Sequence, residues 1–386
     1  MRVIRPLTLA LFVTVLSAVV STYGDPPVAM RPGPLGGGIT LLPNGWKIAP
    51  AGEHIQVGDL PMAMVESPDG RALLIATNGY AKPTITVVDL RQRMVRSSVV
   101  LDHAWLGLAW HPDGKRLYVS GAGNNTIHEL IWADGKLTPG QDLILGPPME
   151  IPREGSNRPD PVSQSFIGGI AVSPDGRRLF AVHVLGQQLS AVDLETSHLI
   201  RSLDLPAEAY TSVVSQDGTT VFVSVWGGAK VLMFDAHSLE ARGEIAVGEH
   251  PNAMALTKDG KRLFVACANT NAVWAVDVAA GKSVEQISVA MYPQAPMGST
   301  PNHVSLSPDE KRLLVANADN NTVAVIDVGK EGASQVEGFV PTGWYPTAAM
   351  FSRDGQQLFV LSGKGLTSVA NPRYGIRPLP GGAAQY

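Results

Sequence analysis

The chain has 386 residues, of which 45% are hydrophobic, and it carries a formal net charge of −4. This balance excludes the basic surface that binding to nucleic acid or to an anionic membrane requires. The single cysteine, Cys267, excludes an internal disulfide bond.

The N-terminus has the pattern of a secretory signal. Arg2 and Arg5 precede an apolar run from Leu7 to Val20, which is short for a membrane span. Cleavage is expected after Ser21 or Gly24, and no cysteine follows there to carry a lipid anchor. Residues 1–24 therefore predict a signal peptide, a periplasmic or extracellular protein, and no membrane attachment after cleavage.

Residues 25–40 are rich in Pro and Gly and predict an extended leader. Trp46 to Val57 (WKIAPAGEHIQV) predicts one strand or two short ones, because apolar and β-branched residues recur in it.

From residue 41 onward a repeated unit organises the chain. It is clearest at Val304 to Val328, where short apolar runs alternate with Ser-Pro-Asp and Asp-Asn-Asn turns. Four of the six spacings between successive turn aspartates lie between 42 and 45 residues. The aspartates are Asp69, Asp113, Asp175, Asp217, Asp259, Asp309 and Asp354.

Four short strands per unit of this length indicate a β-propeller. The sequence thus predicts an all-β fold over residues 41–386, a seven-bladed β-propeller of four-stranded antiparallel blades. The strand within Trp46 to Val57 is expected to complete part of the last blade. The aspartates at the turns and at the ends of the third strands are interpreted as turn and capping groups.

Several segments depart from the repeat. Residues 140–165 and 291–300 are excursions, and His128 with Glu129 interrupts an apolar strand and indicates an exposed edge. Residues 363–386 supply no third or fourth strand, so the seventh blade is expected to be incomplete. Either this blade is short or, as the favoured expectation, the natural chain continues past Tyr386.

The functional face is expected where the second-to-third hairpins and the crossovers between blades lie, which we name the loop face. One aligned position, at the end of each second strand, differs in every blade and predicts a channel mouth. It holds Thr77, Gly121, His183, Val225, Cys267, Asn317 and Ser362.

Three chemistries were considered for the loop face. A metal held by His183, Cys267, His250 and His303 lacks any local ligand spacing, and haem lacks a distinguishable axial ligand. A hydrolase would combine His183 or His303 with Glu154 and Asp160 as acid and base. No catalytic constellation, metal site or cofactor site is therefore predicted in these residues.

Aromatic and imidazole side chains on the loop face suit the binding of a partner or a flat ligand, and covering the core is the alternative role for them. The predicted ligand- or partner-binding residues are Tyr80, Trp105, His183, Trp226, His250, His303, Trp344 and Tyr345. Tyr292 belongs to the same group.

The runs Ser67 to Leu90 (SPDGRALLIATNGYAKPTITVVDL) and Ser307 to Val328 (SPDEKRLLVANADNNTVAVIDV) resemble the YVTN/YncE-like seven-bladed propellers. Leu41 to Pro61 and Leu361 to Pro372 resemble the propeller half of exported bifunctional proteins. In those proteins an alkaline-phosphatase-type phosphoesterase domain follows the propeller. The resemblance implies that any such domain lies beyond Tyr386.

The favoured function is that of a recognition or docking scaffold, with a protein or small molecule bound on the loop face. The resemblance implies that a C-terminal phosphoesterase domain is a further partner. Two alternatives remain: a stand-alone lactonase-type hydrolase, and a surface protein that binds a polymer or another protein.

Overall fold

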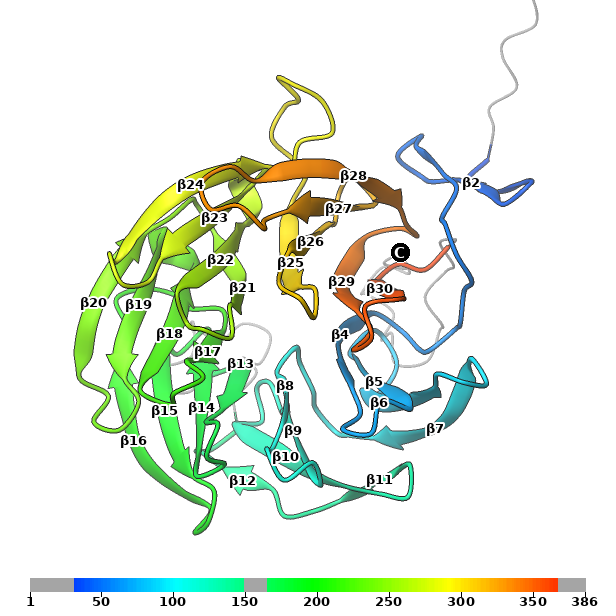
Figure 1. Ribbon diagram of the computed structural model, residues 1–386. Coiled ribbons are helices and arrows are strands. Elements are labelled where there is room, and N and C mark those ends of the chain that lie inside the picture. Colours follow the sequence, from blue (N-terminus) through cyan, green and yellow to red (C-terminus); the bar gives the residue numbers. More distant parts are fainter. Residues whose placement is uncertain (1–30, 149–164, 367–386) are drawn as a thin grey trace, which may run out of the picture.

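The computed structural model describes residues 31–148 and 165–366, so the predicted signal peptide lies outside the described residues. Within these ranges the fold is all-β apart from two single turns of 3-10 helix, η2 (Trp226–Gly228) and η3 (Ala268–Thr270). Seven antiparallel sheets follow one another around a ring (Figure 1). No helix in the described part is long and apolar enough to cross a membrane.

Each of the first six blades has an inner strand, followed outward by the next strands in chain order. The first blade contains β4 (Pro61–Glu66), β5 (Ala72–Thr77), β6 (Thr84–Asp89) and β7 (Met94–Val100). The second contains β8 (Leu108–Trp110), β9 (Arg116–Ser120), β10 (Thr126–Ala133), β11 (Lys136–Pro139) and β12 (Leu143–Ile144). The third contains β13 (Ile167–Val172), β14 (Arg178–His183), β15 (Gln188–Asp193) and β16 (His198–Asp204).

The next three blades are regular four-stranded sheets. The fourth blade contains β17 (Ser212–Val214), β18 (Thr220–Val225), β19 (Lys230–Asp235) and β20 (Ala241–Ala246). The fifth contains β21 (Pro251–Leu256), β22 (Arg262–Cys267), β23 (Ala272–Asp277) and β24 (Lys282–Ser288). The sixth contains β25 (Pro301–Leu306), β26 (Arg312–Asn317), β27 (Thr322–Asp327) and β28 (Gln335–Pro341).

The seventh sheet has only two strands in the described residues, β29 (Pro346–Phe351) and β30 (Leu358–Ser362). The expected strand within Trp46 to Val57 does not pair with it. Instead, β1 (Gly33–Gly36), β2 (Ile39–Leu41) and β3 (Lys47–Ile48) form a separate small sheet. β1 and most of β2 lie where the sequence had predicted an extended leader, and β3 is a short strand within Trp46 to Val57. The β-propeller prediction is confirmed. In the described residues, however, no N-terminal strand completes the last blade as the sequence had predicted.

The turns that carry the repeated aspartate join the first and second strands of each blade. In six blades a Ser or Thr hydroxyl donates a hydrogen bond of 2.5 or 2.6 Å to the carboxylate of the aspartate two residues later. The same oxygen accepts a backbone N–H where the second strand begins, as Ser215 does from Thr220 at 2.9 Å. Ser or Thr hydroxyls in this role fix the turn locally.

The second blade replaces the hydroxyl by an imidazole. His111 Nδ1 accepts the Asp113 N–H at 3.1 Å, and Arg116 donates to the Asp113 carboxylate at 2.8 Å. Burial raises the pKa of Asp113, but hydrogen bonds from the Lys115 N–H and the Arg116 side chain outweigh it and lower that pKa to about 2. In the same blade His128 is buried and bonded to Asp142, so the exposed edge predicted at this strand is wrong.

The blades are held together by seven apolar clusters, each shared between two neighbouring sheets. The five clusters between blades one and six contain 8 to 13 buried residues each. The two clusters that involve β29 and β30 contain six and three. Burial of apolar surface is the main stabilising term, so the seventh sheet is held least firmly.

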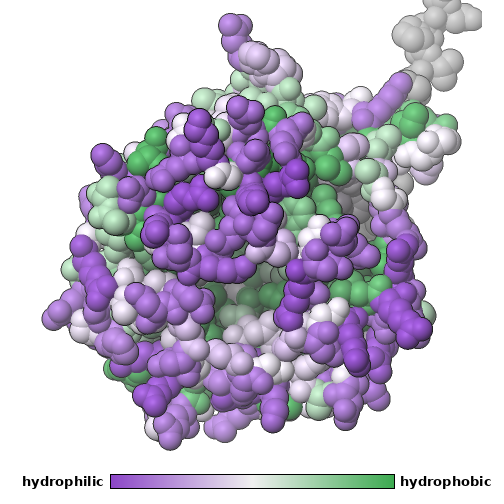
Figure 2. Space-filling model, in the orientation of Figure 1, coloured by the Kyte–Doolittle hydropathy of each residue, from purple (hydrophilic) through white to green (hydrophobic). Residues whose placement is uncertain are grey.

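Three hydrogen bonds connect the seventh blade to the first, one of them from the Arg353 guanidinium to the Pro68 carbonyl. Thr347 Oγ1 donates to the Pro61 carbonyl at 2.5 Å, and the Arg353 N–H donates to the Glu66 carboxylate at 3.1 Å. The face seen in Figure 2 is largely hydrophilic and is hollowed at the centre of the ring.

Replacing Ser215 by Ala is expected to lower the free energy of unfolding by about 1–2 kcal/mol, because two part-buried hydrogen bonds are lost. Ser238→Ala is the control, since the Ser238 hydroxyl accepts only one exposed backbone N–H at 3.2 Å. Urea unfolding monitored by tryptophan fluorescence measures both. Equal losses in the two variants would show that the turn hydroxyl does not hold the blade.

Candidate functional site on the loop face

The loop face is built from the second-to-third hairpins and the blade crossovers, and three groups of aromatic side chains and two separate exposed tyrosines lie on it. Trp226 stands in η2 between β18 and β19, with its side chain 41% exposed. It stacks on His250, the residue before β21, with ring centroids 4.0 Å apart. His250 Nδ1 is buried beneath this stack without a hydrogen-bond partner.

A second group lies where the chain enters β29. The Lys364 ammonium is 5.0 Å from the Trp344 ring centroid and 4.4 Å from that of Tyr345. The Tyr345 N–H donates to Asn321 Oδ1 at 2.9 Å, which anchors the turn to the sixth blade. A cation above two rings stabilises this arrangement by electrostatic attraction to the ring faces.

The third group joins the crossovers into the second and third blades, where Trp105 and Phe166 meet edge to face with centroids 5.2 Å apart. The Tyr80 and Tyr292 side chains are 42% and 60% exposed. The Tyr80 N–H donates to Asp59, which fixes the hairpin between β5 and β6. Six of the predicted residues (Tyr80, Trp105, Trp226, His250, Trp344 and Tyr345) thus lie in these groups or hairpins.

The entry turns into the inner strands share an unusual backbone. Leu60, His250, Thr300 and Tyr345 each have a positive φ, between 46° and 63°, and each precedes a proline. Side chains other than glycine adopt this region at a cost, and such residues concentrate at functional sites. The turn geometry is what aims His250 and Tyr345 at their aromatic neighbours.

His183 is not on the surface. It ends β14 with its side chain 4% exposed, and its Nε2 lies 2.8 Å from Ser190 Oγ, while Nδ1 contacts Ser165 Oγ. Burial lowers the pKa of His183 to about 4. His303, on β25, has its pKa lowered to about 4 by burial as well, and its Nδ1 lies 3.4 Å from the Ala349 N–H.

The other residues at the ends of the second strands are largely buried, as His183 is. Thr77, Val225, Cys267 and Asn317 are at most 3% exposed, so the predicted solvent-facing channel mouth at this position is wrong. These side chains are buried because the third strand of the blade lies beside them. Burial also raises the pKa of the Cys267 thiol to about 12, which supports its interpretation as a small apolar residue.

No described hydrogen bond joins His183 to His303, and Glu154 and Asp160 lie outside the described residues. The described residues also contain no group of three or more His, Cys, Asp or Glu placed to hold a metal. Sequence reasoning missed Lys364, Phe166 and Tyr210. Tyr210 precedes β17, and its pKa is raised to about 12 by burial and then by the charge of Tyr345.

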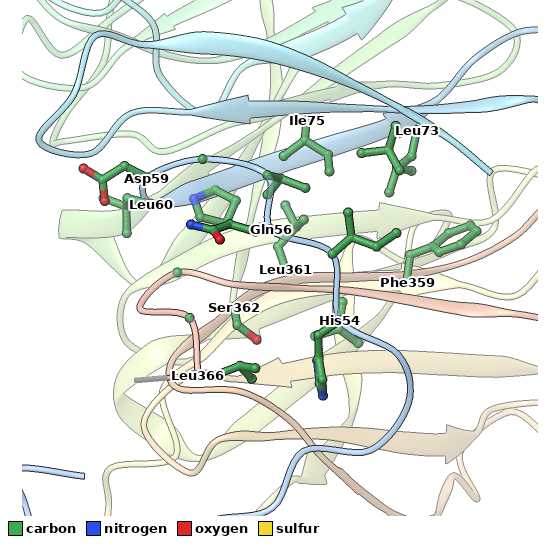
Figure 3. A pocket seen from close by; sticks show the side chains of 18 of the residues that line it. His54, Gln56, Asp59, Leu60, Leu73, Ile75, Phe359, Leu361, Ser362 and Leu366 are labelled. Atoms are coloured by element: carbon green, nitrogen blue, oxygen red, sulfur yellow. The ribbon is translucent and has the colours of Figure 1, made fainter. Parts of the chain in front are cut away.

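A cavity lies elsewhere, at the junction of the seventh and first blades. It has a volume of about 1490 Å³ and is lined by residues 53–61, by β5 and by β30. Figure 3 shows Leu73, Ile75, Phe359 and Leu361 around it.

With the ring of antiparallel sheets and its loop face described, the chain is a β-propeller. A solved structure, that of Kuenenia stuttgartiensis hydrazine synthase, superposes with a TM-score of 0.62 at 19% identity. The alignment covers 81% of this chain and 95% of that chain, and at this identity it supports the fold alone. No family model matches the sequence, and no curated protein matches it.

The stability of the protein is expected to fall between pH 6.5 and pH 4, with His183 as one contributor and His303 as the other. The unfolded chain binds a proton at each of them that the folded imidazole, with its pKa of about 4, does not bind. This linkage amounts to about 2–3 kcal/mol for each histidine across the window. His183→Gln should partly flatten the dependence of unfolding free energy on pH, and imidazole NMR should give the folded pKa. A folded value near 6.5 would contradict the burial described above.

Proposed function

We propose that this β-propeller is an exported recognition scaffold whose loop face binds a protein or a small ligand. The observation that carries the proposal is the combination of exposed Trp226, Tyr80 and Tyr292 with the Lys364 cation over Trp344 and Tyr345. Exposed aromatic rings beside a cation provide large contact area at low entropic cost.

The proposal extends to a link with a phosphoesterase. The resemblance of Leu41 to Pro61 and Leu361 to Pro372 to bifunctional exported proteins supports it. In this role the loop face would hold the substrate or partner on which a second domain acts. The lactonase-type alternative is not favoured, because His183 and His303 both have pKa values lowered to about 4 by burial and are weak bases near neutral pH.

Export is part of the proposal and rests on the pattern of residues 1–24. The intact mass of protein recovered from the cell envelope should correspond to cleavage after Ser21 or Gly24. Retention of residues 1–24 in the cytoplasmic fraction would contradict export.

A photoreactive phenylalanine analogue in place of Trp226 is expected to capture the partner in an envelope extract of the source organism. The control carries the same analogue in place of Lys261, whose side chain is 78% exposed on the turn between β21 and β22. Adducts at least tenfold more abundant at position 226 support the loop face as the binding surface. Equal labelling at both positions would contradict it, and a polysaccharide adduct would favour the polymer-binding alternative.

A further inference from the structure

The cavity between the seventh and first blades has one wall made of a strand with an unpaired edge. Among the described residues β30 pairs with β29 only, whereas the second strand of every other blade lies between two partners. In the sixth blade Leu313, Leu314 and Val315 of β26 are fully buried. Their counterparts Leu358 to Val360 in β30 are only half-buried.

The direction of the free backbone groups follows from the ladder. The Ser352 N–H donates to the Gln357 carbonyl at 2.9 Å, so Gln357 faces β29. Because backbone groups alternate along an antiparallel strand, the N–H and C=O groups of Leu358 and Val360 face the cavity. The equivalent residues of β26, Leu313 and Val315, face the third strand β27.

The opposite wall is residues 53–57. Ile55 and Val57 pack into the cluster shared by the seventh and first blades. Ile287 of the fourth strand β24 occupies the corresponding cluster between the fifth and sixth blades. In the described part of the chain, residues 52–57 make no backbone-to-backbone hydrogen bond. The cavity therefore lies between a second strand and a segment placed like a fourth strand (Figure 3).

We propose that this cavity is a strand-acceptor site, which takes an extended polypeptide segment antiparallel to β30 in the place of a third strand. Main-chain hydrogen bonds to Leu358 and Val360 would supply affinity, and the apolar lining would select alternating side chains. Leu73, Ile75 and Val88 of the first blade and Phe359 and Leu361 of β30 form that lining.

The chemistry of the occupant is given by the third strands that are present. Five of them share apolar residues at positions two, four and five and a closing aspartate: TITVVD, QLSAVD, KVLMFD, AVWAVD and TVAVID. The closing aspartate accepts backbone N–H groups of the next turn, as Asp89 does from Arg91 and Gln92. The expected occupant is a segment with this pattern.

No segment outside the described ranges carries this third-strand pattern in its sequence. Residues 1–30, 149–164 and 367–386 contain only two aspartates, Asp25 and Asp160, and each stands directly before a proline with no apolar run leading into it. The third strands in the described part are already paired in their own blades. The site thus fits a segment of polypeptide from outside these 386 residues.

The probe is a fluorescent peptide copying Asn321 to Val328 of this chain (NTVAVIDV), added to the whole protein and followed by anisotropy. In β27 the N–H groups of Ala324 and Ile326 face β26, since these residues pair with Val315 and Leu313. N-methylation at Ala324 and Ile326 is expected to weaken binding at least tenfold. N-methylation at Val323 and Val325, the matched control, leaves the donors toward β30 intact and should weaken it less.

A photoreactive version of the peptide should label residues 53–61 and 358–362. On the protein, Val360→Pro removes a donor that faces the cavity and should abolish binding, while Val360→Thr should keep it. Equal binding of the two methylated peptides, or labelling elsewhere, would overturn the proposal. Displacement of the labelled peptide by a second copy of the protein would overturn it as well. So would a failure of the peptide to bind because the chain's own residues occupy β30. Should Val360→Pro fail to fold, the peptide series on the unaltered protein still decides.

Discussion

The hydrogen bond from a Ser or Thr hydroxyl to an aspartate two residues later sets the inner two strands of nearly every blade. It ties the turn to the start of the second strand, as Ser67 does through Asp69 and the Ala72 N–H. Once the first and second strands are in register, their apolar residues face both neighbouring sheets. The apolar clusters between blades, and the ring itself, depend on that register.

Because each blade contacts only its two neighbours, the loops at one end of the ring can vary without disturbing the core. The loop face shows this variation: Trp226 stacks on His250 in one sector, and Lys364 covers Trp344 and Tyr345 in another. The seventh sheet departs from the repeat in a different way, since it lacks outer strands in the described residues rather than carrying added loops. The proposed binding to loops and the proposed binding to a strand edge thus involve separate parts of the same ring.

The repeat could be predicted from sequence because its signals are local: Asp309 marks a turn, and Leu313 to Val315 mark the strand that follows. The inward orientation of the His183 side chain could not be predicted, because it depends on the third strand that lies beside this position. Ile55 and Val57 fit a strand pattern, but pairing needs a neighbouring backbone that the described chain does not supply. Lys364 was missed because its contact depends on long-range backbone hydrogen bonds, from the Gly363 N–H to the Tyr345 carbonyl and from the Lys364 N–H to the Trp344 carbonyl.

Amide hydrogen exchange in the free protein tests the open edge of the seventh sheet most directly. The N–H groups of Leu358 and Val360 face the cavity, whereas those of Leu313 and Val315 face β27. The structure predicts exchange at Leu358 and Val360 at least a hundredfold faster than at Leu313 and Val315, since only the latter pair is hydrogen-bonded in a buried ladder. Equal protection at the two pairs of sites would contradict an open seventh sheet.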